Sequence, residues 1–131
     1  MVKGIHAKSV AAEFLEHANE EQEHADKIAK RIVQLGGKPN MNPEGLMTRS
    51  HSDYVEGDDV VSMLRENLIA ERIAIDSYRE IAQYIGDKDP TSRRVMEDVL
   101  SQEEEHAEDI STLLEDIGHE LKEDPQTAAR K

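Results

Sequence analysis

The sequence predicts an all-α protein, and three observations lead to that prediction. Hydrophobic residues recur every three or four positions along three long segments, which is the spacing of one face of an amphipathic helix. The composition favours aliphatic residues, Ala, Glu and Lys, which are typical of long helices. Aromatic residues, which are enriched in strands, make up only 3% of the 131 residues, and the rest of the chain gives almost no support for strands. The length suits a single domain.

The first helix is predicted over residues 7–35. It is expected to end there because Gly36 and Gly37 follow at once and Pro39 lies just beyond, a combination typical of a helix C-terminus. Residues 36–57 show no regular hydrophobic period and are predicted to form a loop.

Two further helices are predicted over residues 58–85 and 90–117. They are joined by a short turn in which Asp89 is the expected N-cap and Pro90 the first helical residue. Residues 118–131 are predicted to be a polar tail.

The long first loop predicts how the helices are oriented. At about 1.5 Å per residue the first helix is roughly 40 Å long. A connection of some 20 residues reaches at most about 70 Å, which is enough to return along the whole helix. The loop is therefore predicted to be a crossover that makes the first two helices parallel, whereas the short turn makes the last two antiparallel.

Charge and composition exclude several classes of function. The chain has 16 Lys and Arg against 29 Asp and Glu, a formal charge of −13, which disfavours nucleic acid and suits the attraction of cations. The absence of Cys excludes disulfides, iron–sulfur clusters and thiol catalysis. No signal peptide or membrane-spanning run is recognised, so we expect a soluble, cytoplasmic protein without a membrane partner.

Charged groups interrupt the hydrophobic stripe of each predicted helix near its middle. Glu and His stand three residues apart in the first and third helices, and a single Glu interrupts the second; the residues are Glu21, His24, Glu71, Glu103 and His106. A buried, unpaired carboxylate costs several kcal/mol, so such groups need a cation or a proton. Carboxylate oxygens with imidazole nitrogens suit iron, manganese or zinc. One Glu-x-x-His can arise by chance on a solvated face, but two copies with a matching third Glu favour a metal site.

Other polar residues on or near these stripes have simpler interpretations. We interpret His17 as a hydrogen-bonded histidine of the core or rim rather than a ligand, and Tyr78 as a packing residue. The neighbouring acidic residues are interpreted most simply as solvated helix faces, and the alternative that some of them line a path for ions stays open; they are Glu16, Glu20, Glu23, Glu104 and Glu105.

The order Glu-x-x-His, long crossover, Glu, short turn, Glu-x-x-His resembles the ferritin-like di-iron carboxylate superfamily, and most of all bacterioferritin and the Dps-like ferritins. The resemblance rests on four stretches and covers nearly the whole chain: His6–Ser9, Glu21–Ala25, Ala70–Arg72 and Glu103–Ala107. It implies a ferritin-like helical bundle that binds two iron ions per complete site. The implied ligands are Glu21, His24, Glu71, Glu103 and His106, with Glu21 and Glu103 bridging the two metals.

The sequence departs from the family pattern at two points. The family has four helices, whereas this sequence predicts three, and none of them corresponds to the family's first helix, which carries a fourth carboxylate. We therefore expect a weaker site and an apolar groove, which either a missing segment or another chain fills. Bacterioferritins also carry a haem-ligating Met directly after the first motif Glu, where this chain has Gln22, so no haem is expected.

The resemblance implies an iron-storage and detoxification subunit. It would be a ferroxidase that oxidises Fe(II) with dioxygen or hydrogen peroxide inside a homo-oligomeric cage of 12 or 24 subunits. Two alternatives stay open: a di-metal peroxidase or manganese catalase on the same bundle, and a truncated bundle that acts as a helical interaction module.

Overall fold

The computed structural model describes the backbone of residues 5–40 and 60–123, and confirms the all-α prediction over these ranges. It contains three long helices there: α1 (Ile5–Gln34), α3 (Val60–Ile85) and α4 (Pro90–Glu123). None of these helices is long and apolar enough to cross a membrane.

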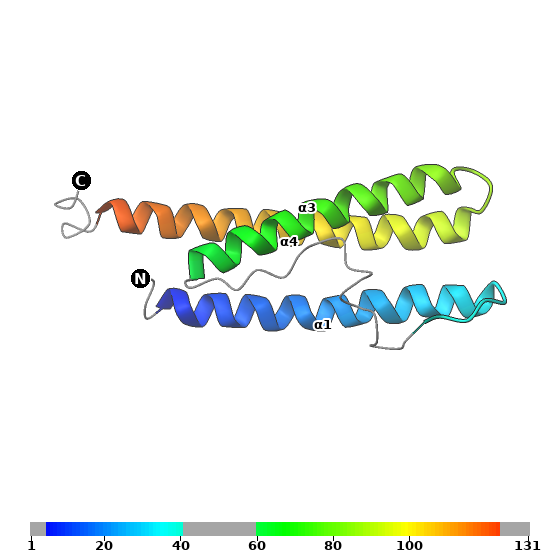
Figure 1. Cartoon of the computed structure of the whole chain (residues 1–131), viewed down its shortest axis with the longest axis horizontal. Helices are drawn as coiled ribbons and strands as arrows, with labels where there is room; N and C mark the ends of the chain where they lie inside the picture. The colour runs from blue at the N-terminus through cyan, green and yellow to red at the C-terminus, as the bar shows by residue number, and fades with distance from the viewer. Residues whose placement is uncertain (1–4, 41–59, 124–131) are drawn as a thin grey trace.

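The directions of the helices are those that the loop lengths predict. Figure 1 shows that α1 and α3 run in the same direction and that α4 runs in the opposite direction. Residues 41–59, which make up most of the predicted crossover, lie outside the described residues, as does the predicted helix start at residue 58. Within the described part, α4 packs against both α3 and α1, whereas α1 and α3 barely contact each other.

Of the three helix ends expected at glycines, those at Gly36 and Gly86 are confirmed, and that at Gly118 is not. Gly36 has a φ of 86°, and the amide N–H of Gly37 donates to the carbonyl of Ile32 at 2.9 Å, while that of Gly36 donates to Val33 at 3.0 Å. These two bonds form a Schellman motif, which a residue with positive φ makes possible. Gly86, with a φ of 54°, ends α3 in the same left-handed conformation.

The start of α4 is fixed to the end of α1. The carboxylate of Asp89 accepts a hydrogen bond from the amide N–H of Ser92 at 3.1 Å, as an N-cap does. Arg31 of α1 donates to both oxygens of Asp89, at 3.1 and 3.2 Å, and to the Ser92 hydroxyl at 2.9 Å. The bonds from Ser92, followed by those from Arg31, hold the pKa of Asp89 below its ordinary value.

The predicted end of the third helix at residue 117 is wrong, because α4 continues to Glu123. A single glycine inside a helix costs only about 1 kcal/mol relative to alanine, and Gly118 is followed by residues that favour helices. Ile117, only 2% exposed, also holds this turn against the core. Residues 124–131 of the predicted tail lie outside the described residues.

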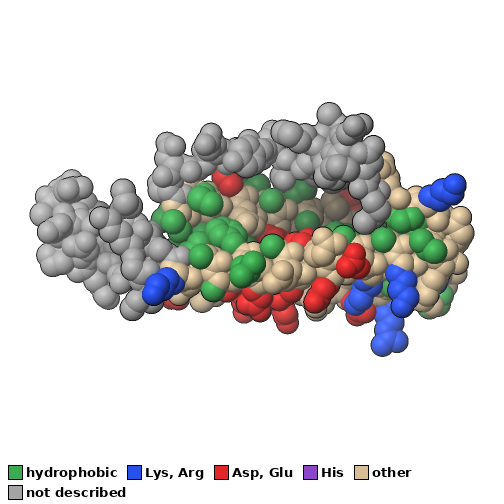
Figure 2. Space-filling model, turned by 90° about the horizontal axis from the view of Figure 1, so that it is seen from below, with side chains coloured by type: hydrophobic (Ala, Val, Ile, Leu, Met, Phe, Trp, Pro, Cys, Tyr) green, Lys and Arg blue, Asp and Glu red, His purple; other side chains and the backbone are tan. Residues whose placement is uncertain are grey.

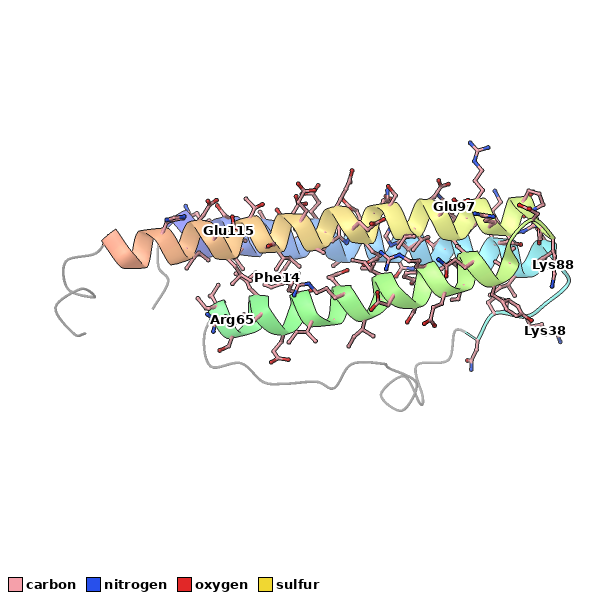
Figure 3. All side chains as sticks on the ribbon, turned by 90° about the horizontal axis from the view of Figure 1, so that it is seen from above. Phe14, Lys38, Arg65, Lys88, Glu97 and Glu115 are labelled. Carbon is pink, nitrogen blue, oxygen red and sulfur yellow. The ribbon has the colours of Figure 1, made fainter. Side chains whose placement is uncertain are left out.

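The main hydrophobic core lies at the end of the bundle where α1 begins and α4 ends. Its buried members come from all three helices: Val10, Leu64, Leu68, Ile110 and Ile117. Phe14 packs against this cluster and points from α1 towards α3 (Figure 3). Several large apolar side chains on the described helices remain exposed, in keeping with the uncovered apolar surface that we expected; they are Leu15, Met63, Ile69, Ile81 and Tyr84.

We predict that Leu64→Ala destabilises the chain by about 2–5 kcal/mol, because Leu64 is 1% exposed and its truncation leaves a cavity between α3 and α4. Gln83→Ala, on an exposed turn of the same helix, should change the free energy of unfolding by less than about 0.5 kcal/mol. Urea unfolding followed by circular dichroism measures both changes. Equal losses for the two variants would contradict the assignment of this core.

Candidate metal centre

The five residues singled out from the sequence meet at the middle of the bundle. Glu21 and His24 come from α1, Glu71 from α3, and Glu103 and His106 from α4. Four of them are buried, with His24 3%, Glu71 9%, Glu103 1% and His106 2% exposed. The fifth, Glu21, keeps 45% of its side chain exposed. Their use as metal ligands stays a prediction.

One candidate position for an ion has four donors. Glu21, Glu71, Glu103 and His106 each offer one ligand atom, and all four atoms lie within 4.8 Å of one another. The Nδ1 atom of His106 lies 3.5 Å from Oε1 of Glu21 and 3.8 Å from Oε2 of Glu103. Ligand atoms about 2.1 Å from one ion are about 3.0 Å apart at right angles and about 4.2 Å apart when opposite. The spacing therefore suits one ion.

A second candidate position lies next to it, beside His24. The Nδ1 atom of His24 is 2.9 Å from Oε1 of Glu103 and 3.7 Å from Oε1 of Glu21. Glu21 and Glu103 thus lie between the two histidines, whose ring centres are 6.0 Å apart. Two carboxylates shared by two imidazoles are the donor arrangement of a pair of neighbouring metal ions.

The outer nitrogen of each of these histidines is held by a residue from the opposite helix. Nε2 of His106 bonds to the carboxylate of Glu20 on α1, and Nε2 of His24 bonds to the side-chain oxygen of Gln102 on α4. When Nε2–H donates to such a partner, Nδ1 keeps its lone pair and faces the shared carboxylates. Nδ1 of His106 is unpaired there, whereas Nδ1 of His24 is hydrogen-bonded to Oε1 of Glu103 at 2.9 Å, a bond that a bound cation would replace. Partners of this kind orient metal-binding histidines and raise their basicity.

The interpretation of Glu20 as part of a solvated face is therefore wrong. Its side chain is 29% exposed, and the hydrogen bond with His106 is the main cause that lowers its pKa. The sequence did contain a signal for this contact: Glu20 and Gln102 each stand directly before the Glu of a Glu-x-x-His motif. Only the packing of α1 on α4 shows that each of them reaches the histidine of the other helix.

The three clustered carboxyl groups all have raised pKa values. Loss of solvent and the neighbouring carboxyl of Glu103 raise the pKa of Glu21 to about 7. Burial raises the pKa of Glu71 and of Glu103, and the charge of another carboxylate of the cluster adds to each increase. The cluster therefore favours a proton or a cation over three free negative charges.

Unpaired polar atoms in the same place show that the residues present fit a metal ion. Oε2 of Glu71 and Nδ1 of His106 are buried and have no hydrogen-bond partner. Buried polar atoms without partners are uncommon and costly. An oxygen and a nitrogen left without partners, beside two further carboxylates, are a donor set for iron, manganese or zinc.

His17 and Tyr78 lie close to the cluster. The Nε2 atom of His17 is 3.0 Å from Oε1 of Glu13, which confirms the expected hydrogen-bonded histidine. Its ring also stacks on that of His106 at a centroid distance of 4.1 Å, a contact that the sequence did not predict. Tyr78 is half-buried, and its pKa is raised first by burial and then by the negative charges of Glu103, Glu21 and Glu71.

Fold and site together define a class of protein: a helical bundle that collects carboxylates and histidines from facing helices into a buried, cation-seeking cluster. The family model of the ferritin-like domain matches residues 1–119. The chain belongs to the ferritin-like family.

Similar proteins and a similar solved structure agree with this assignment. The chain is 33% identical to a bacterioferritin of Brucella melitensis over 111 residues, which are 80% of this chain and 63% of that protein. It is 28% identical to a DNA protection during starvation protein of Halobacterium salinarum over 120 residues, which cover 88% of this chain and 65% of that one. The dodecameric thioferritin of Bacteroides fragilis, a bacterioferritin-related protein, superposes with a TM-score of 0.84 at 38% identity, over 92% of this chain and 73% of its own.

The chain spans only part of the bacterioferritins that it matches, 63% of the Brucella protein and 62% of one from Rhodobacter capsulatus. The described residues supply three helices and three carboxylates to the cluster. What the complete relatives do is therefore carried over to this chain only as a proposal.

We predict that Glu20→Ala weakens Co(II) binding at the centre by about 10–100-fold, because His106 loses the partner that orients it. Glu23→Ala removes an exposed carboxylate one turn away and should leave the affinity unchanged. Titration of the metal-free protein with Co(II), followed by visible absorption, measures both. Equal affinities for the two variants would contradict a positioning role for Glu20.

We also predict a pH dependence of stability in the metal-free protein. Between the ordinary carboxyl pKa of 4.5 and the raised value of about 7 at Glu21, the folded state holds a proton that the unfolded chain has released. The free energy of unfolding should therefore fall as the pH rises through this window and level off above it. Urea unfolding in the presence of a chelator at several pH values measures the slope, which Glu21→Gln should reduce. A slope that the variant leaves unchanged would contradict the prediction.

Proposed function

We propose that this chain is an iron-storage subunit that binds Fe(II) at its buried cluster and oxidises it to Fe(III) with dioxygen or peroxide. The observation that carries the proposal is the sharing of Glu21 and Glu103 between His24 and His106. Two ions held by two common carboxylates lie close enough to pass electrons to one oxidant molecule. Membership of the ferritin-like family and the similarity to bacterioferritins support the choice of iron.

The two positions hold their ions unequally. Beside His106, an ion would meet Glu71 as well as the two shared carboxylates, and the imidazole would make a fourth protein donor. Beside His24, the described residues would supply three donors to an ion: the imidazole of His24 and the shared carboxylates of Glu21 and Glu103. Three carboxylates supply three negative charges against the four positive charges of two Fe(II) ions, so we propose that the second ion is bound more weakly and retains open positions.

Iron supplies the redox chemistry: each Fe(II) gives up one electron, and the oxidant takes two, so that dioxygen with two protons becomes hydrogen peroxide. The chain holds the ions and controls protons. Glu21 and Glu103 orient the pair, while Glu20 and Gln102 fix the two histidines from behind. The carboxyls whose pKa values are raised release their protons when cations arrive, which keeps the cluster neutral enough to stay buried.

Storage of the Fe(III) product needs an enclosed space that one chain does not provide. We propose a homo-oligomeric cage, which the similarity to a dodecameric thioferritin over 73% of that protein supports. The exposed apolar side chains of Leu15, Ile69 and Tyr84 provide surface for contacts between subunits.

The amount of iron retained per chain tests the proposal directly. Purified protein is loaded with Fe(II) without oxygen, exposed to air and desalted. Dozens of ions per chain would support storage in a cage. About two per chain would mean a di-iron site without storage and would favour the peroxidase alternative. One ion or none would overturn the proposal.

We predict that Glu103→Gln slows Fe(II) oxidation by at least about 100-fold, because the amide removes a shared negative donor while keeping the shape of the side chain. Glu104→Gln removes the same charge from the neighbouring exposed position and should leave the rate unchanged. Stopped-flow absorbance of Fe(III) formation measures the rates. Oxidation at the wild-type rate in Glu103→Gln would show that this cluster is not the site of reaction.

A further inference from the structure

A second cluster of possible ligands lies on the outer side of His17, away from the five residues of the buried centre. Glu13, His17 and Asp109 each offer one ligand atom, and the three atoms lie within 4.8 Å of one another. We infer that these three residues form a separate binding site for a divalent cation, next to the buried centre. The inference rests on the proposed function only in naming Fe(II) as the natural ligand.

The distances are compatible with one shared ion, which would replace the hydrogen bond that joins His17 to Glu13 in the metal-free protein. Nε2 of His17 lies 3.0 Å from Oε1 of Glu13 and 3.9 Å from Oδ2 of Asp109. Both distances fall between about 3.0 and 4.2 Å, the range for pairs of ligands that share an ion at about 2.1 Å. An imidazole and two carboxylates are also a donor set that takes a divalent transition metal.

A pocket of about 300 Å³ gives the cluster access to solvent and concentrates negative charge around it. Its lining includes five carboxylates and neither Lys nor Arg; the acidic residues are Glu13, Glu16, Glu108, Asp109 and Asp116. Figure 2 shows acidic side chains gathered along one edge of the molecule, on the half where α1 begins. Clefts lined by charges of one sign raise the local concentration of the opposite ion.

The burial of His17 is the second, independent indication of a ligand. The residue is 5% exposed and directs Nε2 at the cluster, while its other nitrogen, Nδ1, has no hydrogen-bond partner. A cation on Nε2 would move the ring proton to Nδ1. The Glu71 carboxylate, which also has an unpartnered oxygen, lies beside this ring, because His17, Glu71 and His106 offer ligand atoms within 4.8 Å of one another.

The same contacts place the outer ion one imidazole away from the buried centre. The His17 ring stacks on His106 at a centroid distance of 4.1 Å and an angle of 16°. An ion held by Glu13 and Asp109 therefore stands between the acidic pocket and the four-donor position. This is the place for a cation that waits to enter the centre or has just left it.

Two matched variants of α4 test the site. Asp109→Asn removes a ligand, whereas Asp116→Asn removes the same charge from the same pocket, one heptad further along the helix and outside the cluster. Co(II), which air does not oxidise, is titrated into each metal-free protein by calorimetry. We expect Asp109→Asn to lower the affinity for one Co(II) ion by at least about tenfold, and Glu13→Gln to do the same. Asp116→Asn should bind Co(II) with the affinity of the wild type.

The inference is overturned if Asp109→Asn binds Co(II) as the wild type does, or if Asp116→Asn weakens binding equally, which would mean a general effect of charge. Glu103→Gln in the same titration separates this result from the proposed function. The Glu103→Gln variant should lose Co(II) binding at the buried centre and keep the Co(II) ion whose binding depends on Asp109. If Asp109→Asn loses one Co(II) ion while Glu103→Gln binds Co(II) as the wild type does, the outer site is supported and the buried site is overturned.

Discussion

The gathering of three carboxyl groups and two imidazoles at the middle of the bundle, all buried except the partly exposed Glu21, is the constraint on which the rest of the structure depends. Each unpaired charge there costs several kcal/mol, so the fold needs rigid packing on both sides of the cluster. At one end, Val10, Leu64 and Ile110 belong to an apolar core shared by all three helices. At the other end, Arg31 ties α1 to the first turn of α4 through Asp89. The cluster lies between these two fixed ends.

The two Glu-x-x-His motifs of the centre are arranged in nearly the same way, but the residues that support their histidines differ. Each Glu-x-x-His motif is preceded by a residue that reaches the histidine of the other helix, but one of these residues is a carboxylate and the other an amide. The carboxylate of Glu20 can hold His106 by a charge-assisted hydrogen bond, which is stronger than a bond to the neutral amide of Gln102. Glu71 adds a further carboxylate on the His106 side. Both differences would favour an ion beside His106 over one beside His24.

Much of this arrangement could be predicted from the sequence, because it follows the period of single helices. A polar residue on an apolar stripe identified Glu71 as buried, and the repeated spacing of Glu and His identified both motifs. The hydrogen bond of Glu20 with His106 and the stacking of His17 on His106 could not be predicted, because these contacts join α1 to α4 and depend on how each helix is rotated about its axis. Gly118 misled the prediction of the last helix end, since one glycine weakens a helix without ending it when packing holds the turn.

The contacts between the helices suggest why bound ions would matter to the fold as well as to the chemistry. Within the described residues, α1 and α3 both pack on α4 and barely contact each other. Glu71 is the residue of α3 that reaches the cluster, and one of its oxygens has no partner. An ion that joins Glu71 to Glu21 would add a link between α3 and α1 at the middle of the bundle, beyond the apolar core that they share at one end. Because such an ion binds the folded state and not the separated helices, its affinity adds directly to stability. Metal binding and the closure of the bundle would then be one equilibrium, to which an ion beside His24 would contribute less than one beside His106.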